Sequence, residues 1–374
     1  MLSAPEPADG QQVSADESRL TTNGTLTSSK WRGLLKAALK VLLTLVAFYL
    51  LFTHSVRTET GESVTAIRAI LDYLPRIQAA VFWRFTALAV LIKSVGILAS
   101  MVRWHLLLCG QGIVFPFWHI ATTFLIGRFL GTFLPSTIGL DGYKLYDAAR
   151  YSGRTVEAAA ATAVEKCVGV MGIFLSFLLT LPFGYTILGA RAGIVAAITV
   201  PMAATVIAAF FLIAFRPRLV SAMIRRLPIP TRGRMTALLE RLGTAAMAYQ
   251  SQKVLLIQAT VLSVAVHFLT AVMYYCTALA IGAAHAEFWE VTFASTIQIF
   301  ATVMSPFTIA GEGVREIVQA LLLAHKIGAS QSIISAALGF WAAEALTLSG
   351  GIFYFLRTAD YRPRVVLLPR TTAA

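Results

Sequence analysis

Two stretches decide the fold of this chain: RFLGTFLPSTIGLDGYK (residues 128–144) and SPFTIAGEGVRE (residues 305–316). Each follows an apolar run, passes through proline and glycine, and continues into charged residues. Proline removes a backbone donor and glycine favours non-helical backbone, so each stretch is expected to break a helix. The residues that we assign to these two breaks are Pro135, Gly139, Gly142, Pro306, Gly311 and Gly313.

The two stretches share one pattern, P-x-T-I-x-x-[DE]-G-x-[KR], and their prolines are 171 positions apart. A Phe-Trp pair precedes each pattern at the same distance, at Phe117 and Phe288. A ten-residue match with a second aligned pair indicates an internal repeat. We expect repeat one over about residues 85–181 and repeat two over about residues 254–356.

The composition places the chain in a lipid bilayer. Of its 374 residues, 57% are hydrophobic and 13% are charged, and the mean hydropathy is +0.73. Soluble domains have about 45–50% apolar and about 25% charged residues. These values exclude a soluble enzyme, a disordered protein and a secreted disulfide scaffold. The net charge of +13 fits basic cytoplasmic loops, so no nucleic acid partner is expected.

Six apolar runs are long enough to cross a bilayer, at about residues 34–52, 85–108, 155–181, 187–215, 254–282 and 330–356. Two further runs, 117–134 and 288–305, end at the Pro/Gly stretches. The segment 216–253 holds eight basic residues and one acidic residue, which indicates a cytoplasmic location. If both interrupted runs enter the membrane and return, all basic segments lie inside; a break elsewhere in the chain would also place them there. We therefore predict an all-α polytopic membrane protein with six full transmembrane helices and two re-entrant helical hairpins in an inverted repeat.

The remaining segments complete the expected organisation. Residues 1–29 are polar and are expected to form a disordered tail, and residues 30–357 the transmembrane domain. Residues 54–84 repeat apolar positions at helical spacing and predict an amphipathic helix on the outer surface. The segment 216–253 is expected to lie on anionic lipid. Residues 358–374 are expected to form a cytoplasmic tail.

Ionisable residues at membrane depth mark the candidate site, because each costs at least about 2.5–3.5 kcal/mol there and usually faces a pathway or a partner. We expect Arg128, Lys144 and Arg315 to hold a lipid phosphate. The alternative is that the acids only pair with neighbouring cations and cap the second half-helices. Glu344 is expected to pair with a basic residue. The full candidate set is Arg128, Asp141, Lys144, Glu165, Lys166, Glu312, Arg315, Glu316 and Glu344.

Other signals are weaker. Gly127 and Gly131 predict close helix packing rather than a dimer. The three cysteines have no zinc-type spacing, so neither a metal nor another cofactor is expected. The sequence lacks the HExxH, GxSxG, P-loop and Rossmann motifs, and we therefore expect no catalytic activity.

The two stretches, together with Glu165 and Lys166, resemble the lysylphosphatidylglycerol synthase transmembrane region, also called the flippase-like domain family. The resemblance covers about residues 34–357 and implies lipid translocation through a cavity lined by the two hairpins. In this chain Leu140 stands where the family usually has a second glycine. Glu344 stands where the last span often has a basic residue. The positions that match the family are Arg128, Pro135, Gly139, Asp141, Gly142, Lys144, Glu165, Lys166, Pro306, Gly311, Glu312, Gly313 and Glu316.

The resemblance implies a stand-alone lipid translocase of the bacterial inner (plasma) membrane, with both termini cytoplasmic. Its substrate would be an anionic or zwitterionic phospholipid or a polyprenyl- or hopanoid-type lipid, and a separate lipid-modifying enzyme is a possible partner. Two other functions stay open. One is a non-transporting membrane partner or regulator of a lipid or envelope pathway, and the other is a lipid-linked transferase.

Overall fold

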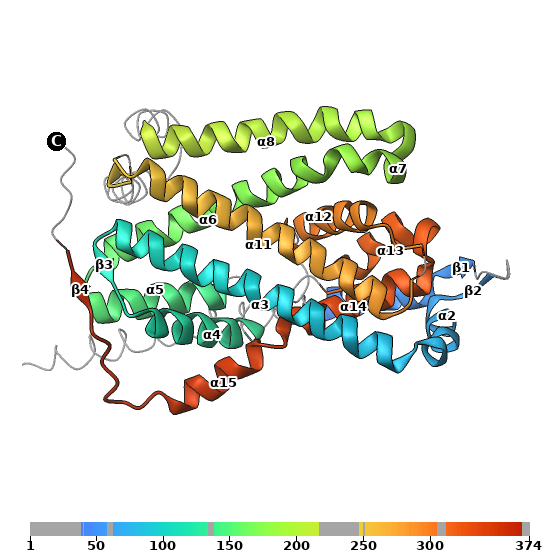
Figure 1. Ribbon diagram of the computed structural model, residues 1–374, viewed down its shortest axis with the longest axis horizontal. Helices are drawn as coiled ribbons and strands as arrows, with labels where there is room; N and C mark the ends of the chain where they lie inside the picture. The colour runs from blue at the N-terminus through green and yellow to red at the C-terminus, as the bar shows by residue number, and fades with distance from the viewer. Residues whose placement is uncertain are drawn as a thin grey trace, which may run out of the picture.

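The computed structural model describes residues 39, 41–57, 63–133, 138–216, 247–249, 251–283, 285–304 and 312–368. Helices dominate these ranges (Figure 1). By length and composition, four helical stretches among them can cross a membrane: Ala79–Gly110, Thr155–Leu188, Lys253–Ala280 and Ala329–Leu356. The chain is thus an all-α multi-pass membrane protein, and these four stretches match four of the expected spans.

The other two expected spans are not among these four stretches. The helix Val41–Thr53 is too short to be a full span on its own, and residues 34–38 and 40 lie outside the described residues. Helix α8 (Ala192–Phe215) has 24 residues and contains Pro201. A total of six spans therefore stays a prediction.

Helices α3 (Ala79–Gly110) and α11 (Lys253–Ala280) form the antiparallel centre of the molecule (Figure 1). Beside the end of α3, Gln252 Nε2 donates a hydrogen bond to the carbonyl of Gly110 at 3.1 Å. Midway along both helices, Lys93 Nζ donates to Thr270 Oγ1 at 2.9 Å. The two helices therefore run in opposite directions.

A helical hairpin follows each of these helices. The first hairpin is α4 (Phe117–Phe133) and α5 (Ile138–Ser152), and the second is α12 (Phe288–Met304) and α13 (Val314–Ile327). Helices α4 and α12 have 17 residues each and start 171 positions apart, the displacement found in the sequence. Figure 1 shows the two hairpins toward opposite ends of α3 and α11.

Glycines set the packing inside the first hairpin. A Cβ on Gly139 would lie 2.4 Å from Gly131 Cα, and one on Gly127 would lie 2.9 Å from Leu140 Cδ1. The predicted close packing at Gly127 and Gly131 is confirmed. The breaking residues Pro135, Pro306 and Gly311 lie outside the described residues.

The last span is two helices, α14 (Ala329–Glu344) and α15 (Thr347–Leu356), where the sequence predicts one. Helix α15 crosses α4 so closely that a Cβ on Gly350 would lie 2.0 Å from the Leu125 carbonyl oxygen. The span before α8 is α6 (Thr155–Thr180), which continues through the short helices η2 (Leu181–Gly184), α7 (Tyr185–Leu188) and η3 (Gly189–Arg191).

The segment before α3 differs from the single amphipathic helix expected over residues 54–84. Strands β1 (Ser55–Arg57) and β2 (Ser63–Thr65) form an antiparallel hairpin, and short helices α2 (Ala66–Tyr73) and η1 (Leu74–Arg76) follow. On α2 the small residues Ala66 and Ala69 are buried, whereas Ile67 and Leu71 are exposed. The prediction was wrong in extent, because the helix is confined to α2 and residues before it pair as strands β1 and β2.

Two flanking segments dock on the bundle. Tyr249 is buried, and its hydroxyl donates to the Leu107 carbonyl at 2.6 Å, so the chain entering α11 contacts the end of α3. Beyond α15, strand β4 (Val366–Leu367) pairs antiparallel with β3 (Ile113–Val114). The predicted tail 1–29, nearly all of the basic segment 216–253 and residues 369–374 lie outside the described residues.

Candidate functional site

The inner ends of both hairpins meet at one turn of α14. Arg128 of α4 donates from Nη2 to Glu344 Oε1 at 2.9 Å and to the Ala343 carbonyl at 3.0 Å. The guanidinium of Arg315, on α13, lies 4.6 Å from the ring centre of Phe340. Phe340 and Glu344 are one helical turn apart and so share a face of α14. Two arginines from the two repeats thus contact the same short surface.

The gap between α14 and α15 explains how Arg128 is held. In an unbroken helix the Ala343 carbonyl would bond to the backbone N–H of Thr347. Here Arg128 occupies that carbonyl, and its Nε donates to Thr347 Oγ1 at 3.2 Å. The Thr347 hydroxyl in turn donates to Glu344. The expectation that Glu344 pairs with a basic residue is confirmed.

Helix α13 of the second hairpin begins with an N-terminal cap formed by its own residues. Gly313 has a φ of +80° and its backbone N–H donates to Glu316 Oε2 at 2.8 Å. A Cβ there would lie 2.6 Å from Ala47 Cβ, so glycine is required both by conformation and by space. Glu316 Oε1 lies 3.4 Å from Arg315 Nη1, and half-buried Glu312 precedes them. Both Arg315 and Glu316 are buried.

Lys93 of α3 joins this cluster. Its neighbours Ala89, Val90 and Ile92 pack in one apolar cluster with Ala342 and Ala343 of α14. Arg128, Glu344 and Arg315 all act electrostatically on the Lys93 ammonium. We refer to these four residues, Lys93, Arg128, Arg315 and Glu344, as the central cluster.

A separate ion-pair network lies between α5 and α6. Lys144 Nζ is 2.6 Å from Glu165 Oε2 and 3.2 Å from Asp141 Oδ1, and its side chain is only 1% exposed. It also lies over the rings of Trp104 and Phe124, at 4.8 and 5.3 Å from their centres. Two carboxylates and two aromatic faces therefore surround this ammonium. The alternative that Asp141 pairs with its helical neighbour at i+3 is what the structure shows.

The same network reaches two other helices. Glu165 Oε1 lies 3.2 Å from Arg103 Nη2 of α3, and Arg103 Nη1 donates to Ser263 Oγ of α11 at 2.8 Å. Lys166 is half exposed and pairs with Asp141 at 2.5 Å. Adjacent residues on α6 thus both belong to this network, Glu165 at its buried end and Lys166 at its exposed end.

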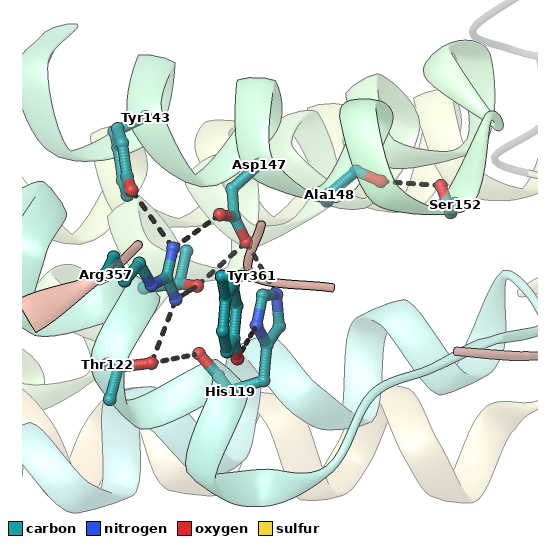
Figure 2. A network of polar contacts seen from close by, with 9 residues as sticks. His119, Thr122, Tyr143, Asp147, Ala148, Ser152, Arg357 and Tyr361 are labelled. Atoms are coloured by element: carbon teal, nitrogen blue, oxygen red, sulfur yellow. Dashed lines mark hydrogen bonds and ion pairs between the residues drawn. The ribbon is translucent and has the colours of Figure 1, made fainter. Parts of the chain in front are cut away.

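A third polar network fixes the chain that follows α15 (Figure 2). Arg357 Nη1 lies 2.7 Å from Asp147 Oδ1, and its Nη2 donates to the hydroxyls of Thr122 and Thr123. His119 contacts the other oxygen of Asp147 at 2.7 Å. The remaining partners are Tyr143, which accepts from Arg357, and Tyr361, which bonds to and stacks on His119. We refer to this network as the C-terminal clamp.

The structure thus divides the predicted site residues into groups. Arg128, Arg315 and Glu344 belong to the central cluster, with Glu312 and Glu316 beside it, while Asp141, Lys144, Glu165 and Lys166 form the α5–α6 network. Gly142 lies inside α5, and a Cβ added there would have nothing within 4 Å, unlike one on Gly139. Within the described ranges, no group of three or more His, Cys, Asp or Glu residues could hold a metal ion.

Sequence reasoning missed Lys93, Arg103 and the role of Arg357. Lys93 and Arg103 could have been found, because each is a single charge inside the long apolar run of α3, and such residues mark partners or pathways. Arg357 was expected only as the last residue of the transmembrane domain, with no partner. Its partners are 210 to 235 positions away, and no local pattern reports them.

Comparison with known proteins identifies the family of the chain. No curated protein matches the chain. A family model described as the lysylphosphatidylglycerol synthase TM region matches residues 37–349. This match contains α3 to α14 and both hairpins, and it covers most of the sequence. The chain therefore belongs to the lysylphosphatidylglycerol synthase TM region family.

Proposed function

We propose that this protein is a lipid translocase: it binds the head group of a membrane lipid at the central cluster and moves the lipid between leaflets. The observation that carries the proposal is the meeting of Arg128 and Arg315, one from each hairpin, on one face of α14. A site shared by two repeats can be opened to either side by moving one repeat against the other.

The arrangement of the hairpins supports this mechanism. Equivalent helices α3 and α11 are antiparallel, so the hairpins that follow them start at opposite ends. If α3 and α11 cross the bilayer, the first hairpin enters from one side and the second from the other. This is the inverted repeat that is typical of secondary transporters.

The ion pairs refine the expected roles of the site residues. Lys144 is enclosed by Glu165, Asp141 and two aromatic rings, so we assign it to holding α5 against α6. Arg128 and Arg315 remain the phosphate ligands. The partly exposed Asp141–Lys166 pair lies beside the first break and is the part of this network that a passing head group could reach.

The other parts of the proposal follow from the family and the charge distribution. The substrate is an anionic or zwitterionic phospholipid, or a polyprenyl- or hopanoid-type lipid, and the protein moves it without catalysing a reaction. The protein lies in a bacterial inner membrane with both termini cytoplasmic. The proposed partner is a separate enzyme that modifies the lipid.

Translocation can be measured with purified protein in proteoliposomes that contain a phospholipid with a fluorescent head group. A membrane-impermeant quencher reports the fraction of probe that leaves or enters the outer leaflet. We expect faster exchange than in empty vesicles, and a loss of at least tenfold in the double variant Arg128→Gln/Arg315→Gln. Arg362→Gln is the matched control, because Arg362 is exposed beyond the clamp. Exchange no faster than in empty vesicles would instead support the non-transporting partner.

A further inference from the structure

Lys93 is a cation with no ion-pair partner among the residues that the structure describes. It lies midway along α3, is half-buried, and donates to the neutral hydroxyl of Thr270. Among the residues that the structure describes, no carboxylate oxygen lies within 4.0 Å of its Nζ. The two break segments, residues 134–137 and 305–311, contain no acidic residue that could supply one.

The neighbouring cations differ from Lys93 in this respect. Arg128 is paired with Glu344 and Arg315 with Glu316. Both carboxylates are further committed, Glu344 to the Thr347 hydroxyl and Glu316 to the Gly313 backbone N–H. The two acids are therefore used by the arginines and the helix ends. The positive charge that remains lies at Lys93.

An unmatched ammonium at the middle of a span is costly, and its hydrogen-bonding capacity is also unfilled. A lysine ammonium has three N–H donors, of which the bond to Thr270 Oγ1 uses one. A phosphate group would supply both the missing charge and acceptor oxygens. Arg128 and Arg315, which act on the same ammonium, would lie at its sides.

We propose that Lys93 is the principal ligand for the phosphate of a lipid head group, with Arg128 and Arg315 completing the site. The inference rests on the proposed function and narrows its substrate to lipids that carry a phosphate monoester or diester. Neutral lipids such as diacylglycerol lack the anion that the site requires. A free phosphate ion has the same head-group chemistry, and the experiment below separates the two sources.

Binding can be measured on the purified full-length chain in detergent by native mass spectrometry and by a thermal shift on lipid addition. The probes are dioleoyl phosphatidic acid, dioleoyl phosphatidylglycerol, dioleoylglycerol and inorganic phosphate. The variants are Lys93→Gln, which removes the charge, and Lys93→Arg, which keeps it. Lys253→Gln is the control, because Lys253 is an exposed lysine at the start of α11.

We expect Lys93→Gln to bind both phospholipids at least tenfold more weakly, as for loss of a charge-assisted hydrogen bond. Lys93→Arg should stay within about threefold of the parent, and Lys253→Gln should match it. Without ligand, Lys93→Gln should melt at or above the temperature of the parent, because it removes an unmatched charge. Equal phospholipid affinity in the parent and Lys93→Gln would overturn the inference, and so would equal affinity of the parent for dioleoylglycerol.

Binding of inorganic phosphate distinguishes a free phosphate ion from a lipid head group as the ligand. If it binds the parent as tightly as the phospholipids do, the ligand is the free ion and the lipid assignment is wrong. The transport assay keeps the two proposals apart. Phospholipid binding that depends on Lys93, without exchange between leaflets, would refute translocation and leave the Lys93 site standing. Exchange by the parent with unchanged binding by Lys93→Gln would refute the site alone.

Discussion

At the scale of single residues, the strongest constraint is the pair Lys144–Glu165. Both side chains are almost completely buried, and Glu165 also accepts from Arg103. Removing the shared carboxylate leaves two cations inside the bundle. Loss of one partner of a buried ion pair costs about 3–5 kcal/mol.

We therefore expect Glu165→Gln to lower the free energy of unfolding by about 3 kcal/mol or more, measured as the midpoint of denaturation in detergent. The control is Asp360→Asn, because Asp360 is exposed and its substitution should leave the midpoint unchanged. A midpoint for Glu165→Gln equal to that of the control would show that the carboxylate is not needed to neutralise Lys144 and Arg103.

Arg128 provides a second test at this scale. Its planar guanidinium serves the Ala343 carbonyl, Glu344 and Thr347 together, and a lysine has no equivalent fork of donors. Arg128→Lys should therefore keep the charge and still slow lipid exchange in proteoliposomes by about tenfold. The control is the substitution Lys326→Arg. Lys326 forms an ion pair with Glu290, and this substitution should not change the rate of lipid exchange. Full activity in Arg128→Lys would mean that only charge matters.

At the scale of elements, two glycines of α5 belong to the same sequence motif, but the packing requires a glycine at only one of the two positions. Gly139 touches the Gly131 backbone, whereas nothing lies within 4 Å of an added methyl group at Gly142. We expect Gly139→Ala to destabilise the protein by about 1–3 kcal/mol through overpacking. Gly142→Ala should be neutral or stabilising by up to about 1 kcal/mol, since alanine favours helix. Thermal unfolding of both variants checks this, and an equal loss of stability in the two would contradict it.

The C-terminal clamp is the other feature at this scale. Without Arg357, the buried carboxylate of Asp147 loses its closest guanidinium partner and residues 357–368 lose their main attachment to α4 and α5. Limited proteolysis should therefore cut Arg357→Ala in this segment several times faster than the parent. Arg362→Ala, which changes an exposed residue of the same segment, is the control. If both variants are cut at the parent rate, the strand pairing of β3 with β4 holds the segment alone.

How much of these elements could be predicted depends on the range of the contacts that form them. The starts of α4 and α12 follow from local apolar runs, and the structure has both at the predicted residues. At the break before α15, Arg128 binds the Ala343 carbonyl from more than 200 positions away. The sequence has no proline there that would predict a break. In the segment before α3 the sequence identified the helix α2 but not the pairing of strands β1 and β2 that precedes it.

At the scale of the whole molecule, the basic residues indicate which side of the bilayer each hairpin faces. Tyr249, near the end of the basic segment 216–253, contacts the end of α3, where the first hairpin begins. Arg357 and Arg154 attach the basic C-terminal segment to the same end. Lys and Arg concentrate in cytoplasmic loops, so the base of the first hairpin should be cytoplasmic. The second hairpin begins where α11 ends, at the opposite end of α3, since Tyr73 bonds to Ile281 there.

Site-directed labelling can test this orientation. In a background with Cys109, Cys167 and Cys276 changed to Ala, one new cysteine replaces Arg150 at the end of α5 or Glu287 just before α12; both positions are exposed. A membrane-impermeant maleimide should label Arg150→Cys only from the cytoplasmic side and Glu287→Cys only from the other side. Opposite labelling would place the two hairpin bases in different compartments, as alternating access through a shared site requires. Labelling of both from one side would make the hairpins parallel, and the central cluster could then not be presented to each leaflet in turn.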